Sequence, residues 1–370
     1  MYALLFADAG LTTGQISTLF VLWSVVSFTF EVPSGAWADT WSRRRLYALG
    51  AFLTAAGFAA WTLWPAYPGF ALGFLLWGLG GALTSGSLEA LVYDELAALG
   101  RPDRYAAVAG RAGTVAILSM LGATLLASPA FLWGGYRLVG ALSVAVAAAA
   151  GVLALGFRET PRQEETDEYG GVRGYLGTLR AGLREVRVSR RVAWAVILSA
   201  LVYSLSALDE YLPLVTRANG VPTAAAPLLF ALPALAMAVG SSLAGRWAGV
   251  GAVRLGGVLA AAAVLLAAGG LSGHAAGMVP IGVAFGLLQF AMVITETRLQ
   301  DATPSRVRAT VLSVSGFAAE VFSVALYGFF GLGADLASVP VLFALAGLPV
   351  LATALAVAAR LPGGGAECPA

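Results

Sequence analysis

The sequence predicts an all-α polytopic membrane protein, and three observations support that fold class. Hydrophobic residues make up 59% of the 370 residues and charged residues only 11%, less than half of the roughly 25% that is typical of soluble domains. The mean hydropathy is +0.83. The apolar runs last about 20 residues, which is the length of a transmembrane helix rather than of a barrel strand. Because lipid offers the backbone no hydrogen-bonding partner, these runs must form helices.

Apolar runs between charged or Gly/Pro-rich stretches predict about 11 complete transmembrane helices. A further apolar stretch, residues 1–7, would rise only about 10 Å as a helix and is too short to cross. It lacks the basic region and cleavage site of a signal peptide, so we interpret it as the end of a truncated first helix. Either the start codon is misassigned or the truncation is real. The predicted segments are 14–34, 46–66, 69–92, 108–130, 136–157, 191–212, 223–245, 253–272, 276–297, 308–332 and 339–360.

A long polar stretch, 158–190, divides the chain into two halves. The N-terminal helical half is 1–157, the C-terminal half is 191–360, and residues 361–370 form a cytoplasmic tail. Within the linker, apolar residues alternate at helical spacing over 172–187 with arginines on the opposite side, which predicts an amphipathic helix on the inner membrane surface. We interpret this stretch as a tether between the halves; a regulatory or partner-binding role is the alternative.

The arginines predict the orientation. All 22 basic residues are arginine. If the loop after segment 14–34 is cytoplasmic, every arginine except Arg137 and Arg217 lies inside, in strong agreement with the positive-inside rule. The sequence therefore predicts a multi-pass protein of the cytoplasmic membrane with a cytoplasmic C-terminus.

Several classes of function are disfavoured by composition. The net charge of +2 gives no basis for a nucleic-acid partner, and the single cysteine, Cys368, and single histidine, His274, cannot build a metal cluster. The sequence contains no H-E-x-x-H, G-x-S-x-G or Walker motif, so an enzyme and ATP-driven transport are not expected. We expect no metal and no cofactor, and we expect a monomer.

The two halves repeat the same features in the same order. Residues 35–39 (GAWAD) follow one apolar segment, and residues 245–249 (GRWAG) follow another. This indicates duplication, and parallel repeats place the substrate at their interface near the bilayer midplane. Each half also has an acidic pair five residues apart at an inner helix end: Glu89 and Asp94, and Glu296 and Asp301.

Residues 35–45 (GAWADTWSRRR) resemble the signature loop of the major facilitator superfamily, roughly G-x-L-A-D-R-x-G-R-R. Residues 31–35, 89–94 and 304–310 also resemble bacterial members. The resemblance covers essentially the whole chain except most of the first helix. It implies a bundle of two six-helix halves and transport by alternating access. The antiporter signature G-P-x-x-G-G is absent from 110–129, which weakens an assignment as a proton-coupled drug antiporter.

The resemblance also implies a cytoplasmic gate. In the family this loop acts as an inner latch that favours the outward-facing state, which assigns latch roles to Gly35, Asp39, Arg43 and Arg44. The alternative is that the arginines only anchor topology. Further charges at the inner helix ends complete the predicted gate: Glu89, Asp94, Arg111, Glu296 and Asp301.

Polar groups inside the membrane are candidates for substrate binding or coupling, because an ionisable residue there is costly. Glu320 lies near the middle of segment 308–332, where it could carry protons or bind a cationic substrate; a carboxyl used in helix packing is the alternative. Gln289 is also mid-span, although a lone glutamine more often bridges helices.

Two further sets of candidates lie on other segments. Tyr203 and Glu210 share a face of segment 191–212, with Asp209 beside them close to the outer mouth. These acids could attract cations, form an outer gate or mark a helix end. Trp23 and Glu31 share a face of segment 14–34.

The sequence therefore predicts a secondary active transporter that moves a small organic solute, with proton-coupled efflux as the first hypothesis. An uptake permease or facilitator for a sugar or other metabolite is the alternative, and a non-transporting receptor-like relative is a third. The expected partners are a small-molecule substrate, protons and membrane lipids.

Overall fold

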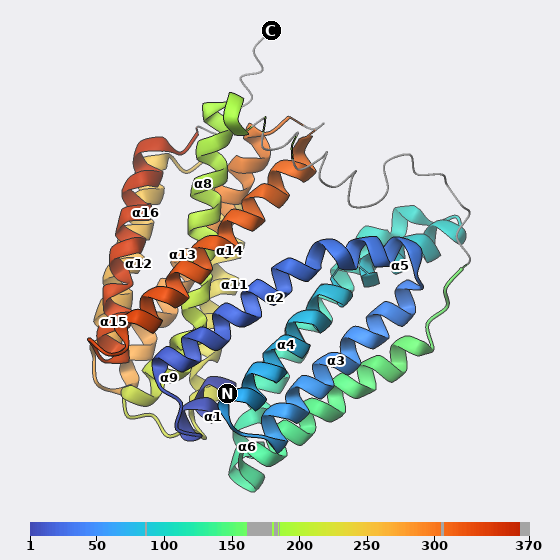
Figure 1. The fold of residues 1–370 in the computed structure, drawn as a ribbon. Helices are drawn as coiled ribbons and strands as arrows, with labels where there is room; N and C mark the ends of the chain where they lie inside the picture. Colours follow the sequence, from blue (N-terminus) through green and yellow to red (C-terminus); the bar gives the residue numbers. More distant parts are fainter. Residues whose placement is uncertain (86, 161–179, 181–183, 185, 305–306, 363–370) are drawn as a thin grey trace. The chain divides into compact units, whose positions relative to one another are not determined.

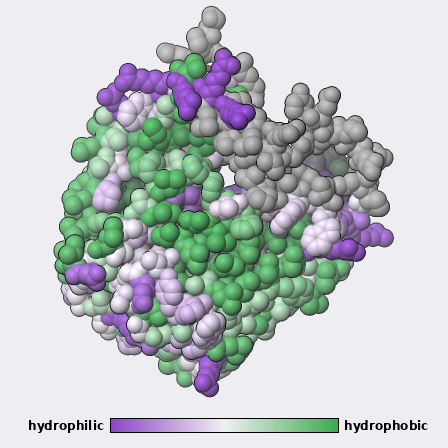
Figure 2. All heavy atoms as spheres, viewed as in Figure 1, coloured by the Kyte–Doolittle hydropathy of each residue, from purple (hydrophilic) through white to green (hydrophobic). Residues whose placement is uncertain are grey.

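The computed structural model describes residues 1–85, 87–160, 180, 184, 186–304 and 307–362. Within these residues it contains helices and no strand, and ten helices are long and apolar enough to cross a membrane. Apolar side chains cover most of the described surface that is visible in Figure 2. The predicted all-α membrane fold is therefore confirmed.

The chain forms two compact units, which we call the N-terminal unit (8–11 and 18–175) and the C-terminal unit (1–7, 12–17 and 176–370). The boundary at 175/176 falls inside the predicted linker 158–190. The division into halves at 157 and 191 stays a prediction, as does the amphipathic helix 172–187, most of which lies outside the described residues.

The N-terminal unit is built around a close helix crossing. A Cβ atom on Gly50 of α3 would lie 2.6 Å from the carbonyl oxygen of Gly80 of α4, and the reverse distance is also 2.6 Å. Small residues at such crossings let helix backbones approach in membranes. The helices are α2 (Thr13–Thr40), α3 (Arg43–Leu63), α4 (Tyr67–Thr84), α5 (Ser87–Ala98), the 3₁₀ turn η1 (Pro102–Arg104) and α6 (Tyr105–Leu155).

The long helix α6 contains two of the predicted crossings. Its 51 residues would extend about 77 Å if straight, more than twice the hydrocarbon thickness of about 30 Å. Gly135, with φ of 58°, interrupts the helix and gives it two legs, which are visible in Figure 1. Segments 108–130 and 136–157 lie on either side of this break, as two separate predicted crossings require; the number of eleven crossings stays a prediction.

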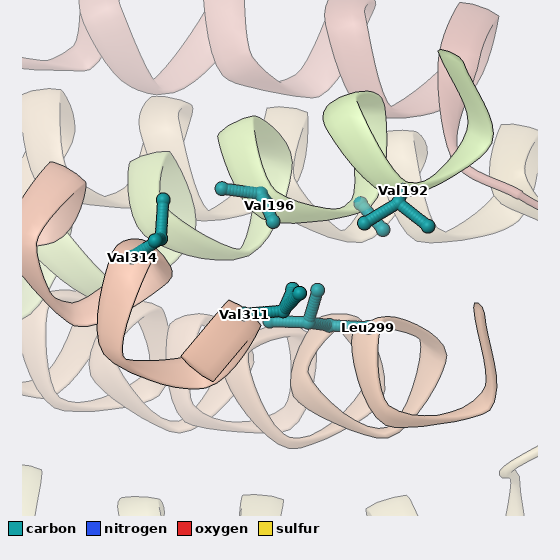
Figure 3. Packing of buried hydrophobic residues seen from close by; sticks show 6 residues of the cluster. Val192, Val196, Leu299, Val311 and Val314 are labelled. Carbon is teal, nitrogen blue, oxygen red and sulfur yellow. The ribbon is translucent and has the colours of Figure 1, made fainter. Parts of the chain in front are cut away.

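The C-terminal unit has a core between α8, α13 and α14. Val192 and Val196 of α8 face Val311 and Val314 of α14, with Leu299 of α13 beside them (Figure 3). All five side chains are buried. The unit comprises α1 (Tyr2–Asp8), α8 (Arg190–Ser204), η2 (Leu205–Tyr211), α9 (Leu212–Ala218), α10 (Ala226–Leu229), α11 (Ala231–Arg246), α12 (Ala252–Gly270), η3 (Ala275–Gly277), α13 (Met278–Ala302), α14 (Arg308–Gly333), α15 (Val339–Leu345) and α16 (Gly347–Arg360).

Two predicted boundaries need correction. Segment 191–212 is too short, because the span continues from α8 through η2 and α9 to Ala218. Segment 69–92 consists of two helices, α4 and α5, whose junction includes residue 86, outside the described part. The short helix expected over 1–7 is observed as α1, in which Ala3, Leu4 and Phe6 are buried.

Candidate transport and gating sites

The most unusual backbone in the C-terminal unit is the 3₁₀ helix η2, which interrupts the span Arg190–Ala218. It is seven residues long, whereas 3₁₀ runs beyond three or four residues are uncommon and often mark a hinge inside a helix. Asp209 and Glu210 lie in η2. The sequence-based boundary at 212 placed them at the end of the segment, but α9 extends the span by about 12 Å beyond Glu210.

Side chains from three other helical elements surround the end of η2. The Tyr2 hydroxyl of α1 donates to the Glu210 carboxylate. Tyr211, which is fully buried, shares a 2.7 Å hydrogen bond with Ser17 and stacks on Phe330 of α14 with ring centroids 3.7 Å apart. Aromatic rings and hydroxyl groups therefore enclose one side of the acidic 3₁₀ segment.

Glu320 belongs to the same region of the C-terminal unit. It is half-buried in α14, 12 residues after Arg308 and 13 before Gly333, so it lies about 18–20 Å from either helix end. Tyr327 lies two turns further on the same helix face. Its ring centroid lies 6.3 Å from that of Tyr211, the last residue of η2. The three predicted acids therefore lie on two elements, η2 and α14, that pack against each other.

Three tyrosines and one serine of this region were not predicted: Tyr2, Tyr211, Tyr327 and Ser17. The hydrogen bonds that join Tyr2 to Glu210 and Ser17 to Tyr211 link residues 208 and 194 positions apart, so helical periodicity cannot reveal them. Tyr203 was predicted, yet it is exposed on α8 and precedes η2.

Gln289 has a partner in a neighbouring helix. Its side-chain amide donates to the Ser241 hydroxyl at 3.0 Å and so bridges α13 to α11. The crossing is close, because a Cβ on Gly240 would collide with the Gly286 carbonyl. The bridging alternative therefore has a structural basis, and a role for Gln289 in substrate binding stays a prediction.

Trp23 belongs to an aromatic cluster in the N-terminal unit. It stacks on Trp77 of α4 with ring centroids 5.3 Å apart, and both rings are half-buried. Behind them, Trp61 packs edge-on against Trp77 and Phe74 and donates its indole N–H to the Phe70 carbonyl at 3.0 Å. Glu31, predicted to share the face of Trp23, is exposed further along α2.

Arg43 and Arg44, two of the residues predicted for the gate, lie at the start of α3; their gate role stays a prediction. Ser42 caps this helix by accepting from the Arg45 backbone N–H, and Arg43 forms an ion pair with Asp94 of α5. Glu159 accepts from the Ser42 hydroxyl and, at 2.7 Å, from the Arg43 backbone N–H. Sequence reasoning placed Glu159 in the linker and missed this role. Arg44 donates to the Phe157 carbonyl at 2.9 Å.

The other predicted gate residues lie apart from this ion pair. Glu89 and Arg111 are exposed, and Glu89 lines a cavity of about 440 Å³ between α3, α4 and α6. Gly35 and Asp39 lie in α2, but their surroundings are outside the described part of the structure. Glu296 and Asp301 are exposed at the end of α13.

Between those last two acids, Arg298 is buried, with 6% of its surface exposed. Its guanidinium donates to the carbonyl groups of Ala248 and Val250, at 3.0 and 3.2 Å, in the turn between α11 and α12. This residue was not predicted as part of the gate. Among the described residues, no group of three His, Cys, Asp or Glu side chains is placed to hold a metal ion.

Comparison with known proteins decides the family. The family model described as Major Facilitator Superfamily matches residues 1–326. The chain belongs to the Major Facilitator Superfamily. It is therefore a multi-pass membrane transporter and not an enzyme. A sequence search of curated proteins finds no match.

Solved structures of Major Facilitator Superfamily fold are similar along almost the whole chain. The nucleoside transporter NupG has a TM-score of 0.74 at 12% identity, covering 97% of this chain and 93% of that one. The inward-open xylose transporter XylE from E. coli has a TM-score of 0.66 at 14% identity, covering 98% and 90%. A bacterial homologue of the human lysosomal transporter Spinster has a TM-score of 0.65 at 16% identity, covering 97% and 93%. At these identities the likeness shows the fold alone.

Proposed function

We propose that this transporter exports a small organic solute in exchange for protons, and that the acidic groups of η2 and α14 carry the coupling. The observation that carries the proposal is the placement of Asp209 and Glu210 in the 3₁₀ break η2, which packs against α14, the helix that contains Glu320. Ionisable side chains inside a membrane span are costly and mark ion pathways or proton relays. Broken helices supply such sites in other secondary transporters.

The cargo is proposed to be largely apolar. The half-buried Trp23–Trp77 pair offers flat aromatic surface in the N-terminal unit, and ligand sites are lined mainly by hydrophobic and aromatic side chains. The acidic groups of the C-terminal unit favour a cargo that also carries a positive charge.

The alternative is transport of a polar metabolite. Structures of the same fold include transporters of a nucleoside and of xylose, and Gln289 and Ser241 supply amide and hydroxyl groups inside the C-terminal unit. Under this alternative the direction would be uptake, and transport would continue without a proton gradient.

We further propose a monomer in the cytoplasmic membrane with its C-terminus inside. The arginine distribution supports this orientation. Cys368 is the single cysteine of the chain, so a membrane-impermeant maleimide should label inside-out vesicles and leave intact cells unlabelled. Labelling of intact cells would reverse the orientation.

Proton movement in liposomes tests the coupling. The purified chain is reconstituted, candidate cargo is added from a panel of cationic apolar compounds, sugars and nucleosides, and lumenal pH is recorded. We expect cargo-driven proton movement that is lost in Glu320→Gln and kept in Asp335→Asn, an exposed acid just beyond α14. Cargo flux without proton movement, or undiminished coupling in Glu320→Gln, would refute the assignment.

A further inference from the structure

The C-terminal unit has an apolar groove that none of the transport residues uses. Helices α11 and α12 both pack along α13, and between them lies a cavity of about 540 Å³. Carbon side chains line it, with the Trp247 indole as the one polar side-chain group in the lining: Val239, Leu243 and Trp247 follow α11, Val258 comes from α12, and Val283 and Leu287 come from α13.

The length of the groove matches one leaflet of a bilayer. Along α11 its lining extends from Ala236 to Trp247, which is about 16 Å at the helical rise. Half of the hydrocarbon core is about 15 Å. The groove is therefore about as long as the acyl chain of a single phospholipid in one leaflet.

The surface end of the groove is positively charged. Arg246 follows Leu243 by three residues and Val239 by seven, so it continues the same face of α11 beyond the groove. Arg254 precedes Val258 by four residues on the matching face of α12. Both arginines are exposed, and both flank the α11–α12 turn that carries Trp247. Tryptophan is enriched at the level of lipid headgroups.

No carboxylate on α11, on α12 or in the turn between them balances this charge; on α13, Asp301 lies 11 residues beyond Phe290, about 16 Å further along the helix. The sequence has no Asp or Glu between Glu210 and Glu296, so α11, α12 and their turn contain no acidic residue. Glu296 lies on α13 six residues after Phe290, which turns it about 120° away from the groove-lining face. The groove therefore combines an apolar slot of leaflet depth with a cationic mouth.

We propose that this groove binds one anionic phospholipid, with an acyl chain along α11 and the phosphate between Arg246 and Arg254. Anionic headgroups are attracted to arginines at the membrane surface, and the apolar lining of the slot suits a long hydrocarbon chain. The assignment rests on the membrane-embedded fold and is independent of the transported cargo.

Quenching of Trp247 fluorescence tests the proposal. The full chain is placed in phosphatidylcholine vesicles that contain phosphatidylglycerol or phosphatidylcholine with brominated acyl chains. Trp247→Phe identifies the contribution of this residue. We expect brominated phosphatidylglycerol to quench it at about one-tenth of the mole fraction that brominated phosphatidylcholine needs. Equal quenching by the two lipids would overturn the proposal.

Matched variants separate the headgroup from the slot. Arg246→Gln with Arg254→Gln should abolish the preference for phosphatidylglycerol, whereas Arg101→Gln with Arg104→Gln, which removes two exposed arginines elsewhere, should keep it. A preference that survives the first pair would also overturn the proposal. If that pair fails to fold, the single change Arg254→Gln should reduce the preference about threefold.

The slot itself is tested by filling it. Val239→Phe, on an exposed lining position, should weaken quenching by both lipids, while Val264→Phe, exposed on α12 outside the groove, should leave it unchanged. Unchanged quenching in Val239→Phe would refute occupancy of the groove. If Trp247 is instead shielded from both lipids and the vesicle-embedded chains cross-link as pairs through this face, the occupant is a second copy and the lipid assignment is wrong.

Discussion

The loops that follow α2 and α11 occupy equivalent places in the sequence repeat, yet they are fastened in different ways. In the N-terminal unit the cation is Arg43, the first residue of α3 directly after the loop, and it pairs with Asp94 of α5. In the C-terminal unit the loop supplies backbone carbonyl groups, and the cation is Arg298 of α13. An arginine therefore stabilises each of these two regions, but its acceptor is a carboxylate in one unit and a pair of backbone carbonyl groups in the other.

The two fastenings differ in how easily they break. The side chains of Arg43 and Asp94 are 16% and 41% exposed, and pairs with that much solvent access contribute about 0–1 kcal/mol. Arg298 is buried and donates two charge-assisted hydrogen bonds to neutral acceptors, a kind worth about 1.5–3 kcal/mol. We therefore expect the contact between Arg43 and Asp94 to be released more easily than the contacts of Arg298 with the α11–α12 turn.

The largest effect is expected for Arg298→Ala. Loss of both hydrogen bonds, together with the space left by the side chain, should destabilise the protein by about 3 kcal/mol. Thermal unfolding in detergent measures this change. Glu296→Ala, exposed two residues earlier on α13, is the control and should change stability by less than about 0.5 kcal/mol. Equal shifts in both variants would remove the distinction between the fastenings.

An intermediate effect is expected at the close helix crossings, because each unit contains one of them within itself. Gly80→Ala should destabilise by about 2 kcal/mol, because the new methyl would lie 2.6 Å from the Gly50 carbonyl oxygen. Gly286→Ala should behave alike, since its methyl would lie 2.8 Å from the Ala236 carbonyl oxygen. The matched control is Gly81→Ala, where nothing lies within 4 Å. Chemical denaturation of each variant gives the comparison, and a neutral Gly80→Ala would contradict the packing argument.

The smallest effect on stability is expected for Asp94→Asn. Its cost should stay below about 1 kcal/mol and fade at 1 M salt, where screening acts within about 3 Å. Unfolding midpoints at low and high salt measure this, with exposed Glu89→Gln as the control. A large cost that is independent of salt would show that the N-terminal fastening is as fixed as the C-terminal one.

Much of the fold follows from the sequence because apolar length is a strong signal in lipid. The predicted segment 253–272 agrees closely with α12, and 46–66 with α3. The span around η2 was misjudged because Asp209 and Glu210 look like a helix end. The chain instead passes these acids in a tighter helix and resumes as α9.

The site was less predictable than the fold. Single acids such as Glu320 stand out as candidates in the sequence because an ionisable group in a span is rare. Their companions could not, because Tyr2 meets Glu210 and Ser17 meets Tyr211 only after folding. Glu159 was hidden for another reason: a carboxylate in a polar linker gives no sign that it will cap α3.

The 3₁₀ geometry of η2 has a mechanical consequence. Its seven residues rise about 2.0 Å each, against about 1.5 Å in an α-helix, so η2 is longer than its α-helical equivalent by about 3.5 Å. It is also overwound by about 140°, because each residue turns about 120° rather than about 100°. Relaxation of η2 to α-helical form would therefore shorten the span and rotate it at the same time. The shortening would draw α9 toward α8, and the rotation would change the face that Tyr211 presents to α14.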